Sequence, residues 1–452
     1  MELLQRVNDI VWGIPTLSLI LIVGIVLTAI TGFAQFRYLP RALRAFLAPQ
    51  KDNDNNVGES SFRALCTALA ATVGTGNLAG VAGAIAIGGP GAVFWIWVGG
   101  ILGMITKFAE ATLSVHYRYP GKNGGYLGGP MYVIRQAMPK RFHFLGYLYC
   151  VFGIIAAFGV GNATQINTLI SGVDSMCTYL GLQASSFRNV LIGVGLAVLI
   201  SILFLGGAKR IGAAAETLVP FAAVLYILMG FGVFLCRYKA IQGAFLSIIQ
   251  GAFSPKAVTG GMVGSAMITL RVGASRGVFT NEAGMGTAGI AHASAKVRHP
   301  VEQGLMGIVE VFIDTIVICT ITALVILCSG INVEFGQDMG ILLTTQAFSA
   351  VYGGWVTIVL TAAVCCFAFA TILGWGLYGA RCAQFLFGEQ AWRVFVAVQA
   401  FSVILGSVLD TKTIWLFADT VNGLMAIPNL LSIIYLLPKI RFLVKEYENS
   451  KE

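Results

Sequence analysis

The stretch that decides the fold is Ala70-Ala-Thr-Val-Gly-Thr-Gly-Asn-Leu-Ala-Gly80, which places a Gly-X-Gly motif with polar neighbours inside an apolar segment. A second stretch of this kind, Gly277-Val-Phe-Thr-Asn-Glu-Ala-Gly-Met-Gly-Thr-Ala-Gly289, follows in the second half of the chain. Glycine costs about 1 kcal/mol relative to alanine inside a helix and lets the backbone leave the helical conformation. The two stretches therefore predict two helices that are interrupted in the middle of a membrane.

The composition supports a membrane setting. Hydrophobic residues make up 57% of the 452 residues and charged residues only 11%, and the mean hydropathy is +0.82. Soluble domains usually carry about 25% charged residues, so a water-soluble enzyme is excluded. No nucleophile and base stand in a pattern typical of catalysis. The formal net charge of +9 comes from Lys and Arg in short runs between apolar segments, which indicates membrane topology rather than a nucleic-acid partner.

Eleven apolar segments can be marked as candidates to cross a bilayer core of ~30 Å. Connections that alternate on one side of these segments hold 21 Lys and Arg residues, whereas those on the other side hold six. Because basic residues favour the cytoplasmic side, the difference predicts a multi-pass protein of the cell membrane with its N-terminus outside and its C-terminus in the cytoplasm. The segments are residues 14–36, 61–87, 91–116, 143–172, 189–207, 212–236, 262–294, 301–329, 352–380, 391–409 and 413–437.

The interrupted segments are the second and the seventh, so each opens a set of five helices. An odd number of spans per set gives the two sets opposite orientations in the membrane. The spacing predicts an all-α fold with a 5+5 inverted repeat and one additional N-terminal helix, and a binding site between the two interruptions. The expected divisions are an N-terminal helix and cytoplasmic loop (1–60), a first repeat (61–236), an extracellular connection (237–261), a second repeat (262–437) and a cytoplasmic tail (438–452).

The first interruption predicts a site with two kinds of backbone ligand. The half-helix after the break begins with free N–H groups at the positive end of its dipole, which suits a carboxylate. The half-helix before the break ends in free carbonyl groups, which suit a hard cation. Helix packing through small residues is the alternative, because Gly76 and Gly80 are four residues apart. The expected N–H donors are Thr75, Gly76 and Asn77, and the expected carbonyls are those near Ala70, Thr72 and Val73.

Charged residues inside the apolar segments have more than one interpretation. Glu282 in the second interruption is an intramembrane carboxylate, which is typical of substrate or proton handling. The alternative is an ion pair with Arg271 or Arg276 that holds the interrupted helix together. Lys107 and Glu110 are three residues apart, so they are expected to pair on one helix face.

Three further side chains are candidates for the space between the interruptions. Gln165 carries an uncharged amide, which suits either a polar substrate or a hydrogen bond between helices. Thr371 and Trp375 are four residues apart and share one helix face, which places a hydroxyl suited to a cation next to a large apolar wall. A lipid-facing position is the alternative for Trp375.

Four motifs resemble the alanine or glycine:cation symporter family. The resemblance covers nearly the whole chain and implies the leucine-transporter (LeuT) fold with one helix added at the N-terminus. It implies sodium-coupled symport of small neutral amino acids by alternating access, with alanine and glycine as substrates and D-alanine as a further candidate. The motifs are Gly74-Thr-Gly-Asn-Leu-Ala-Gly80, Lys107-Phe-Ala-Glu-Ala-Thr-Leu-Ser-Val-His-Tyr-Arg118, Gly128-Gly-Pro-Met-Tyr132 and Phe279-Thr-Asn-Glu-Ala-Gly-Met-Gly286.

The resemblance also implies which residues hold the two cargoes. Na⁺ is the expected coupling ion, held by the Thr371 hydroxyl opposite the carbonyls near Ala70 and Val73, with Asn77 as a further ligand. Two alternatives stay open: a proton-coupled permease with Glu282 as the proton carrier, and an amino-acid sensor that does not transport. The expected partners are the amino acid and membrane lipid. Substrate contacts are expected from Thr75, Gly76, Asn77, Gln165, Phe279, Met285, Thr371 and Trp375, the last of which limits side-chain size.

Overall fold

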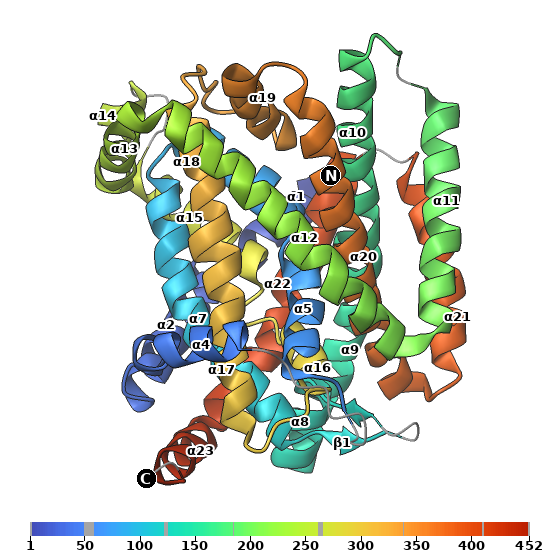
Figure 1. Ribbon diagram of the computed structural model, residues 1–452. Coiled ribbons are helices and arrows are strands. Elements are labelled where there is room, and N and C mark those ends of the chain that lie inside the picture. Colours follow the sequence, from blue (N-terminus) through green and yellow to red (C-terminus); the bar gives the residue numbers. More distant parts are fainter. Residues whose placement is uncertain are drawn as a thin grey trace.

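The computed structural model describes residues 2–48, 58–121, 125–183, 185–260, 265–337, 339–408 and 411–450. These residues form a helical molecule in which long helices run roughly side by side between two ends (Figure 1). The described strands are β1 (Tyr119–Pro120) and β2 (Tyr126–Leu127), which pair antiparallel at the end that also carries the C-terminus. The expected all-α class is therefore confirmed, apart from this short hairpin.

Each of the eleven predicted apolar segments contains helical structure. The helices are α2 (Ile14–Ile30), α5 (Ser61–Thr72) with η1 (Gly76–Gly80) and α6 (Val81–Gly88), α7 (Ala92–His116), α9 (Phe144–Phe158) with η3 (Gly159–Ala163) and α10 (Thr164–Tyr179), α11 (Ser186–Leu205), α12 (Gly207–Cys236), α15 (Ala266–Asn281) with α16 (Thr287–His292), α17 (Pro300–Val311) with η5 (Phe312–Cys319) and α18 (Thr320–Cys328), α20 (Val356–Phe387), α21 (Ala391–Gly406) and α22 (Thr411–Tyr435).

The structure contains fewer candidate membrane spans than the sequence predicts, when helices are judged by length and composition. Seven helices among the described residues are long and apolar enough to cross a membrane, or nine if each of two bent pairs is one span. The predicted segments left outside that count are 262–294 and 391–409. Their longest helices, α15 and α21, have 16 residues each, which is short for an independent span of about 20 residues. The structure thus supports a polytopic membrane protein but does not confirm eleven spans.

Shorter helices connect and cover the long ones. The stretch expected as a plain connection, 237–261, is helical over most of its described length, and the expected tail, 438–452, is mainly one helix. The shorter elements are α1 (Glu2–Val11), α3 (Ala34–Arg37), α4 (Leu39–Leu47), α8 (Pro130–Ala137), η2 (Lys140–Phe142), η4 (Tyr238–Ala240), α13 (Ile241–Phe253), α14 (Pro255–Thr259), α19 (Ile341–Tyr352) and α23 (Leu437–Asn449). Residues 49–57 of the expected N-terminal loop lie outside the described residues.

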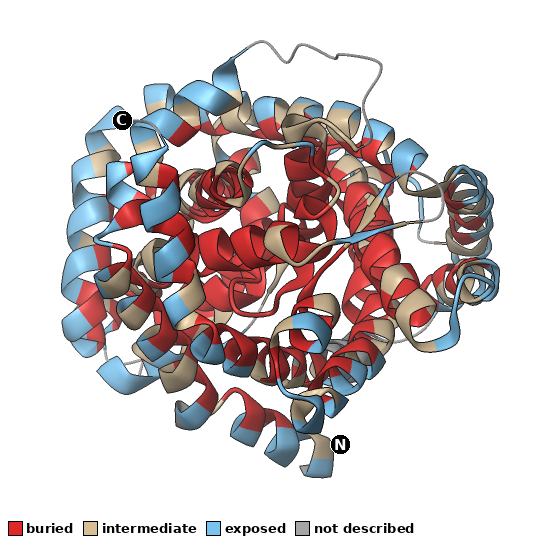
Figure 2. Cartoon of the chain, turned by 90° about the horizontal axis from the view of Figure 1, so that it is seen from below, coloured by how far each residue is buried: buried red, intermediate tan, exposed pale blue. Residues whose placement is uncertain are grey.

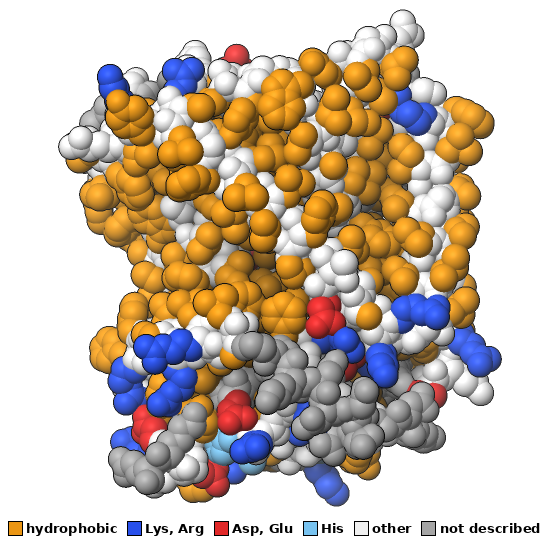
Figure 3. Space-filling view, in the orientation of Figure 1, with side chains coloured by type: hydrophobic (Ala, Val, Ile, Leu, Met, Phe, Trp, Pro, Cys, Tyr) orange, Lys and Arg blue, Asp and Glu red, His pale blue; other side chains and the backbone are white. Residues whose placement is uncertain are grey.

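The surface has the distribution of a protein surrounded by lipid. Figure 2 shows buried residues on the inner helices and exposed residues mainly around the perimeter. The exposed perimeter is apolar: Leu228 and Phe231 on α12, for example, are more than half exposed. A broad hydrophobic band covers most of the visible face, and Lys, Arg, Asp and Glu gather mainly at the end that carries α4 and α23 (Figure 3). This arrangement places the long helices in the hydrocarbon region.

Close contacts between helices fix the centre of the molecule. A Cβ atom on Gly307 of α17 would lie 2.8 Å from the Lys107 carbonyl oxygen of α7, so only glycine allows these helices to approach. A Cβ atom on Gly374 of α20 would lie 2.8 Å from the Ala71 nitrogen of α5. The second contact holds α20 against the helix that contains the first interruption, as expected for small residues at membrane helix interfaces.

Candidate functional site

The first predicted interruption is present. α5 ends at Thr72, and the chain continues at Gly76 as η1 and α6, with a bend of 49° between the two halves. Val73 is extended, with φ −76° and ψ 100°. The Gly74 N–H donates to Oδ1 of Asn77 at 2.9 Å, so Asn77 satisfies one backbone donor that the break leaves over. The side chain of Asn77 therefore shapes the break as well as standing beside it.

Buried oxygen atoms from two other helices converge on Gly74. A Cβ atom on this residue would lie 2.6 Å from Oγ1 of Thr371 and 3.8 Å from Oε1 of Gln165. Within the described residues neither oxygen has a hydrogen-bond partner, and the same holds for Oγ1 of the buried Thr75. The Gln165 Nε2 donates to the Val160 carbonyl at 3.1 Å, which leaves Oε1 as the open acceptor. Open oxygens of this kind suit an ammonium group or a hard cation.

Asn77 also contacts a carboxylate that the sequence did not single out. Its Nδ2 donates to Oδ1 of Asp314 at 2.7 Å and to the Asp314 carbonyl at 3.0 Å. The Thr315 hydroxyl donates to Oδ2 of Asp314 at 2.8 Å, and Asp314 is fully buried in η5. A buried carboxylate beside the break is a functional candidate, because charge within a membrane span is expensive. The sequence feature that could have identified Asp314 is the presence of this acidic residue inside an apolar segment.

The second predicted interruption is present as well. Between α15 and α16 the backbone is left-handed at three residues: Glu282 (φ 53°), Gly284 (φ 95°) and Gly286 (φ 75°). Oε1 of Glu110 on α7 accepts the N–H groups of Gly284 at 2.9 Å and Gly286 at 3.0 Å. Asn429 of α22 donates to the same oxygen at 2.7 Å and to the Gly284 carbonyl at 2.8 Å. Side chains from two neighbouring helices thus hold the unwound segment.

The expected pair between Lys107 and Glu110 is wrong. Lys107 donates to Glu310 of α17 at 3.0 Å, and both side chains are fully buried. The close approach of α7 and α17 brings Glu310 nearer than the residue one turn along the same helix. The other oxygen of Glu310 contacts His292 Nε2 at 2.9 Å, and His292 Nδ1 lies 2.7 Å from Nε2 of Gln303. Glu110 is thereby left to bind the second interruption.

Glu282 does not form the ion pair expected with Arg271. Arg271 pairs with Asp9 at 2.7 Å, and both side chains are about half exposed. The two oxygens of Glu282 instead accept the Trp375 indole N–H at 2.8 Å and the Thr287 hydroxyl at 2.6 Å. Because α15 ends at Asn281, Glu282 lies in the unwound segment and its carboxylate joins α16 to α20. The carboxylate is a link between elements, held by two neutral donors.

The apolar residues expected as walls are divided between two clusters. Phe279 and Trp375 are buried in one cluster together with Ala68 and Ala71 of α5. Met285 is fully buried in another. A lipid-facing position for Trp375 is excluded, because this side chain is fully buried. The structure therefore brings Phe279 and Trp375 together next to the first interrupted helix, whereas Met285 as a wall stays a prediction.

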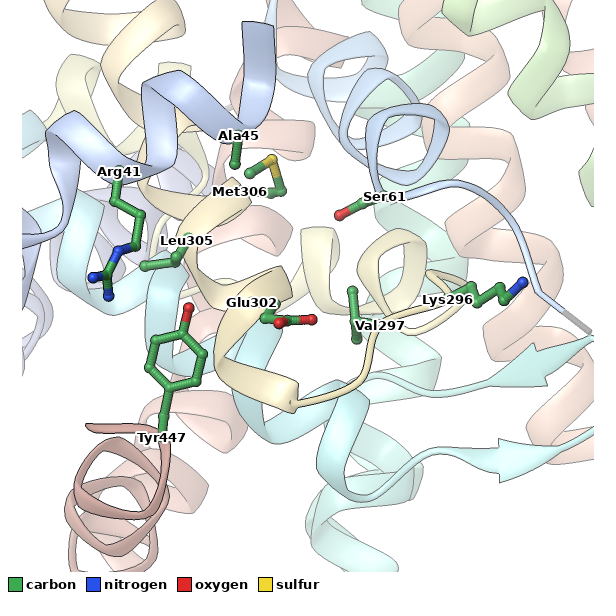
Figure 4. A pocket seen from close by; sticks show the side chains of 9 residues that line it. All are labelled: Arg41, Ala45, Ser61, Lys296, Val297, Glu302, Leu305, Met306 and Tyr447. Carbon is green, nitrogen blue, oxygen red and sulfur yellow. The ribbon is translucent and has the colours of Figure 1, made fainter. Parts of the chain in front are cut away.

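A separate cavity lies near the charged end of the molecule. It has a volume of about 280 Å³, and Figure 4 shows side chains of α4, α17 and α23 around it. Arg41, Glu302 and Tyr447 are among its lining residues, and none of the site residues predicted from the sequence lines it. This cavity is distinct from the candidate site between the interruptions. Within the described residues, no group of three or more His, Cys, Asp or Glu side chains is arranged to hold a metal ion.

The lipid-facing exterior, the two interrupted helices and the buried oxygens at the first break define a multi-pass membrane transporter. A model of the sodium:alanine symporter family matches residues 1–452, and the chain belongs to this family. It is 40% identical to the sodium/alanine symporter AgcS of Methanococcus maripaludis, over 96% of this chain and 94% of that protein. It is 35% identical to the probable sodium/glutamine symporter GlnT of Bacillus subtilis, over 98% of this chain and 90% of that protein.

The fold is also found in a solved transporter. The crystal structure of MhsT in complex with L-phenylalanine, a protein of the LeuT fold, superposes with a TM-score of 0.58 at 14% sequence identity. The match covers 86% of this chain and 99% of that chain. At this identity the likeness shows the fold alone, and it confirms the LeuT-like architecture implied by the sequence motifs.

Proposed function

We propose that the protein is a sodium-coupled symporter of alanine and glycine that accepts both enantiomers of alanine and works by alternating access. The observation that carries this proposal is the group of buried oxygens around Gly74, from Thr371 and Gln165, which have no protein partner among the described residues. Polar groups in a membrane interior are expensive without partners. Such a group is therefore suited to a ligand that arrives and leaves.

The sodium ion is proposed to bind where α5 ends. The last carbonyls of a helix lack intrahelical donors and carry the negative end of its dipole. Thr371 adds a hydroxyl oxygen on the opposite side of Gly74, and Asn77 offers Oδ1 next to the break. The donor set is made of oxygen atoms only, which suits a hard cation. The proposed carbonyl ligands are those of Ala70, Thr72 and Val73.

The amino acid is proposed to bind beside the ion, between the two interruptions. Its carboxylate meets the N–H groups of Thr75 and Gly76 at the start of the second half-helix, at the positive end of the dipole. Its ammonium group meets the amide oxygen of Gln165. Its side chain meets an apolar wall, which limits it to a hydrogen or a methyl group. The proposed wall residues are Phe279, Met285 and Trp375.

Both enantiomers of alanine follow from this arrangement. A site that binds the two charged ends through helix ends and amides distinguishes the hydrogen from the methyl group on Cα only weakly. The family includes relatives named for alanine and for glutamine. The apolar wall of the pocket, rather than the groups that bind the substrate's carboxylate and ammonium, is therefore proposed to decide substrate size. We also propose that the charged end of Figure 3 faces the cytoplasm, with the N-terminus outside.

The deciding experiment measures uptake of labelled alanine into liposomes that contain the purified protein. A sodium gradient and a pH gradient are imposed separately, and glycine, D-alanine and leucine are tested as competitors. The proposal expects accumulation with the sodium gradient alone and competition by glycine and D-alanine but not by leucine. Accumulation driven by the pH gradient alone would establish proton coupling instead. Binding of alanine without accumulation under either gradient would establish a sensor.

A further inference from the structure

Glu282 has an unusual position for a charged residue. It is a non-glycine residue in the left-handed backbone conformation, at φ 53°, and only 3% of its surface is exposed. A conformation of this kind costs on the order of 1 kcal/mol or more for a residue with a Cβ atom, so it persists where surrounding contacts hold it. The contacts here are the hydrogen bonds of its carboxylate with Trp375 and Thr287. The strain is therefore linked to where this carboxylate points.

Trp375 depends on Glu282 for its one polar contact. The indole is fully buried, and its Nε1 is the only polar atom of the side chain, bonded to Oε1 of Glu282 at 2.8 Å. On its other side the residue packs against η3, where a Cβ atom on Gly161 would lie 2.3 Å from the Trp375 Cβ. The Tyr378 ring contacts the indole edge-on, with 5.9 Å between ring centroids. Backbone and rings thus restrict the indole, and Glu282 fixes its direction.

We propose that Glu282 is a specificity-determining positioning residue, which sets the upper size limit of the transported amino acid by holding the Trp375 indole in the substrate pocket. This inference rests on the proposed function, in which Trp375 forms the pocket wall. Hydrogen bonds to a charged partner are stronger than neutral ones, and more so where water is excluded. Without the carboxylate, the buried indole N–H has no partner, so the ring is expected to leave this position.

Thr287 holds the same carboxylate from the other side. Its hydroxyl donates to Oε2 of Glu282 at 2.6 Å, and Thr287 is the first residue of α16. The wall of the pocket on α20 is thereby tied to the half-helix that follows the second interruption. Both carboxylate oxygens are engaged with donors in this arrangement, which makes Glu282 a brace for Trp375 rather than a ligand of the cargo.

The test compares how well leucine and alanine compete for labelled alanine uptake in liposomes. In Glu282→Ala, leucine is expected to compete about tenfold better relative to alanine than in the unchanged protein, because one charge-assisted hydrogen bond to the wall is lost. Trp375→Phe removes the same bond from the other side and is expected to shift selectivity in the same direction. The double variant is expected to exceed the larger single effect by little, since both changes remove one interaction.

Glu282→Gln is the matched control. The glutamine Oε1 still accepts the indole N–H, so leucine is expected to remain excluded to within about threefold, because a neutral acceptor is weaker than a charged one but keeps the geometry. Equal loss of selectivity in the Gln and Ala variants would overturn the proposal. Independent, multiplying effects of Glu282→Ala and Trp375→Phe would overturn it too. A merely structural role would change the amount of active protein and leave the leucine-to-alanine ratio alone.

A milder change keeps the proposal testable if Glu282→Ala does not fold. Thr287→Val is close in shape and removes only the second hydrogen bond, so leucine competition is expected to rise by about threefold. Unchanged leucine exclusion in Thr287→Val would overturn the inference, whatever the Glu282→Gln variant does, because leucine is expected to stay excluded in that control. Failure of the proposed function has a different signature, because the unchanged protein would then show no sodium-driven alanine uptake at all.

Discussion

The two interruptions differ in how their polar groups are satisfied. At the second, the N–H groups of Gly284 and Gly286 are bound by Glu110, and the Ala283 N–H donates to Oδ1 of Asn281 at 2.9 Å. Two side-chain atoms there lack a partner among the described residues, an oxygen of Glu110 and the amide nitrogen of Asn281. At the first, the atoms without a partner are three oxygens, those of Thr75, Gln165 and Thr371.

This difference indicates a division of labour. A backbone that leaves the helix inside a membrane must be satisfied by neighbours, and the second interruption meets this need with two neighbouring helices. The first interruption keeps three oxygens without a hydrogen-bond partner among the described residues, from three separate elements. Two of them are hydroxyls, which can donate as well as accept, and the third is an amide oxygen, which only accepts. The lone pairs of all three suit a donor or a cation that arrives with a ligand. We therefore expect loss of the Glu110 contacts that hold the second interruption to affect folding, and loss of the open oxygens at the first to affect binding.

The largest effect is expected from Glu110→Ala, which removes the shared acceptor of the second interruption. Two buried backbone N–H groups lose their partner, at about 1–3 kcal/mol each, and Asn429 keeps only its bond to the Gly284 carbonyl. The variant is therefore expected to lose on the order of 3–5 kcal/mol of stability. The measurement is the melting temperature and the yield of monodisperse protein in detergent. Glu110→Gln keeps an acceptor oxygen and should remain foldable. An alanine variant that melts like the unchanged protein would remove the distinction between the two interruptions.

Gly74→Ala is expected to have the next largest effect, and on transport rather than folding. The new methyl group would meet the Thr371 hydroxyl at 2.6 Å, and rotation of that side chain relieves the contact but turns the oxygen away. Uptake of alanine should fall on the order of 100-fold, because the ion loses the Thr371 oxygen and the added methyl group, 3.8 Å from Oε1 of Gln165, narrows the space for the ammonium group. Each factor of ten corresponds to about 1.4 kcal/mol. Gly80→Ala is the matched control, since a Cβ atom there meets nothing within 4 Å. Equal uptake in both variants would contradict the proposed site.

Thr371→Ala is expected to act on sodium alone. The hydroxyl is buried and has no partner among the described residues, so its loss leaves the fold intact but removes one oxygen ligand from the cation. The sodium concentration for half-maximal uptake should rise about tenfold, which corresponds to roughly 1.4 kcal/mol. Thr371→Ser restores the hydroxyl and should restore the sodium dependence. A sodium dependence that does not change in the alanine variant would move the ion elsewhere.

Local sequence predicts the interruptions but not the contacts that hold them. The glycine clusters fix where each helix breaks, because the cost of glycine in a helix is a local property. Asp314 beside Asn77, and Glu110 beside Gly284, are contacts between distant segments that depend on how the helices pack. The helix-face pair of Lys107 and Glu110 was wrong for the same reason. The sequence shows which residues are neighbours along one helix. Which of them form an ion pair also depends on the side chains that a second helix brings close, as Glu310 does for Lys107.

The smallest expected effect is a change in melting temperature that has opposite signs at the two interruptions. Thr75→Val removes a buried hydroxyl that has no partner among the described residues, whereas Thr287→Val removes one that donates to Glu282. An unsatisfied buried hydroxyl costs free energy. Thr75→Val should therefore leave the stability of the ligand-free protein unchanged or raise it by up to about 1 kcal/mol, and the melting temperature should follow. Thr287→Val should lower it by a similar amount. In the presence of alanine the order changes, because Thr75→Val removes one of the oxygens left open for a ligand at the first interruption, whereas Thr287→Val leaves those oxygens in place. The stabilisation by saturating alanine should therefore shrink in Thr75→Val. Melting curves of both variants with and without alanine test the idea, and it fails if Thr75→Val lowers the ligand-free melting temperature as much as Thr287→Val does.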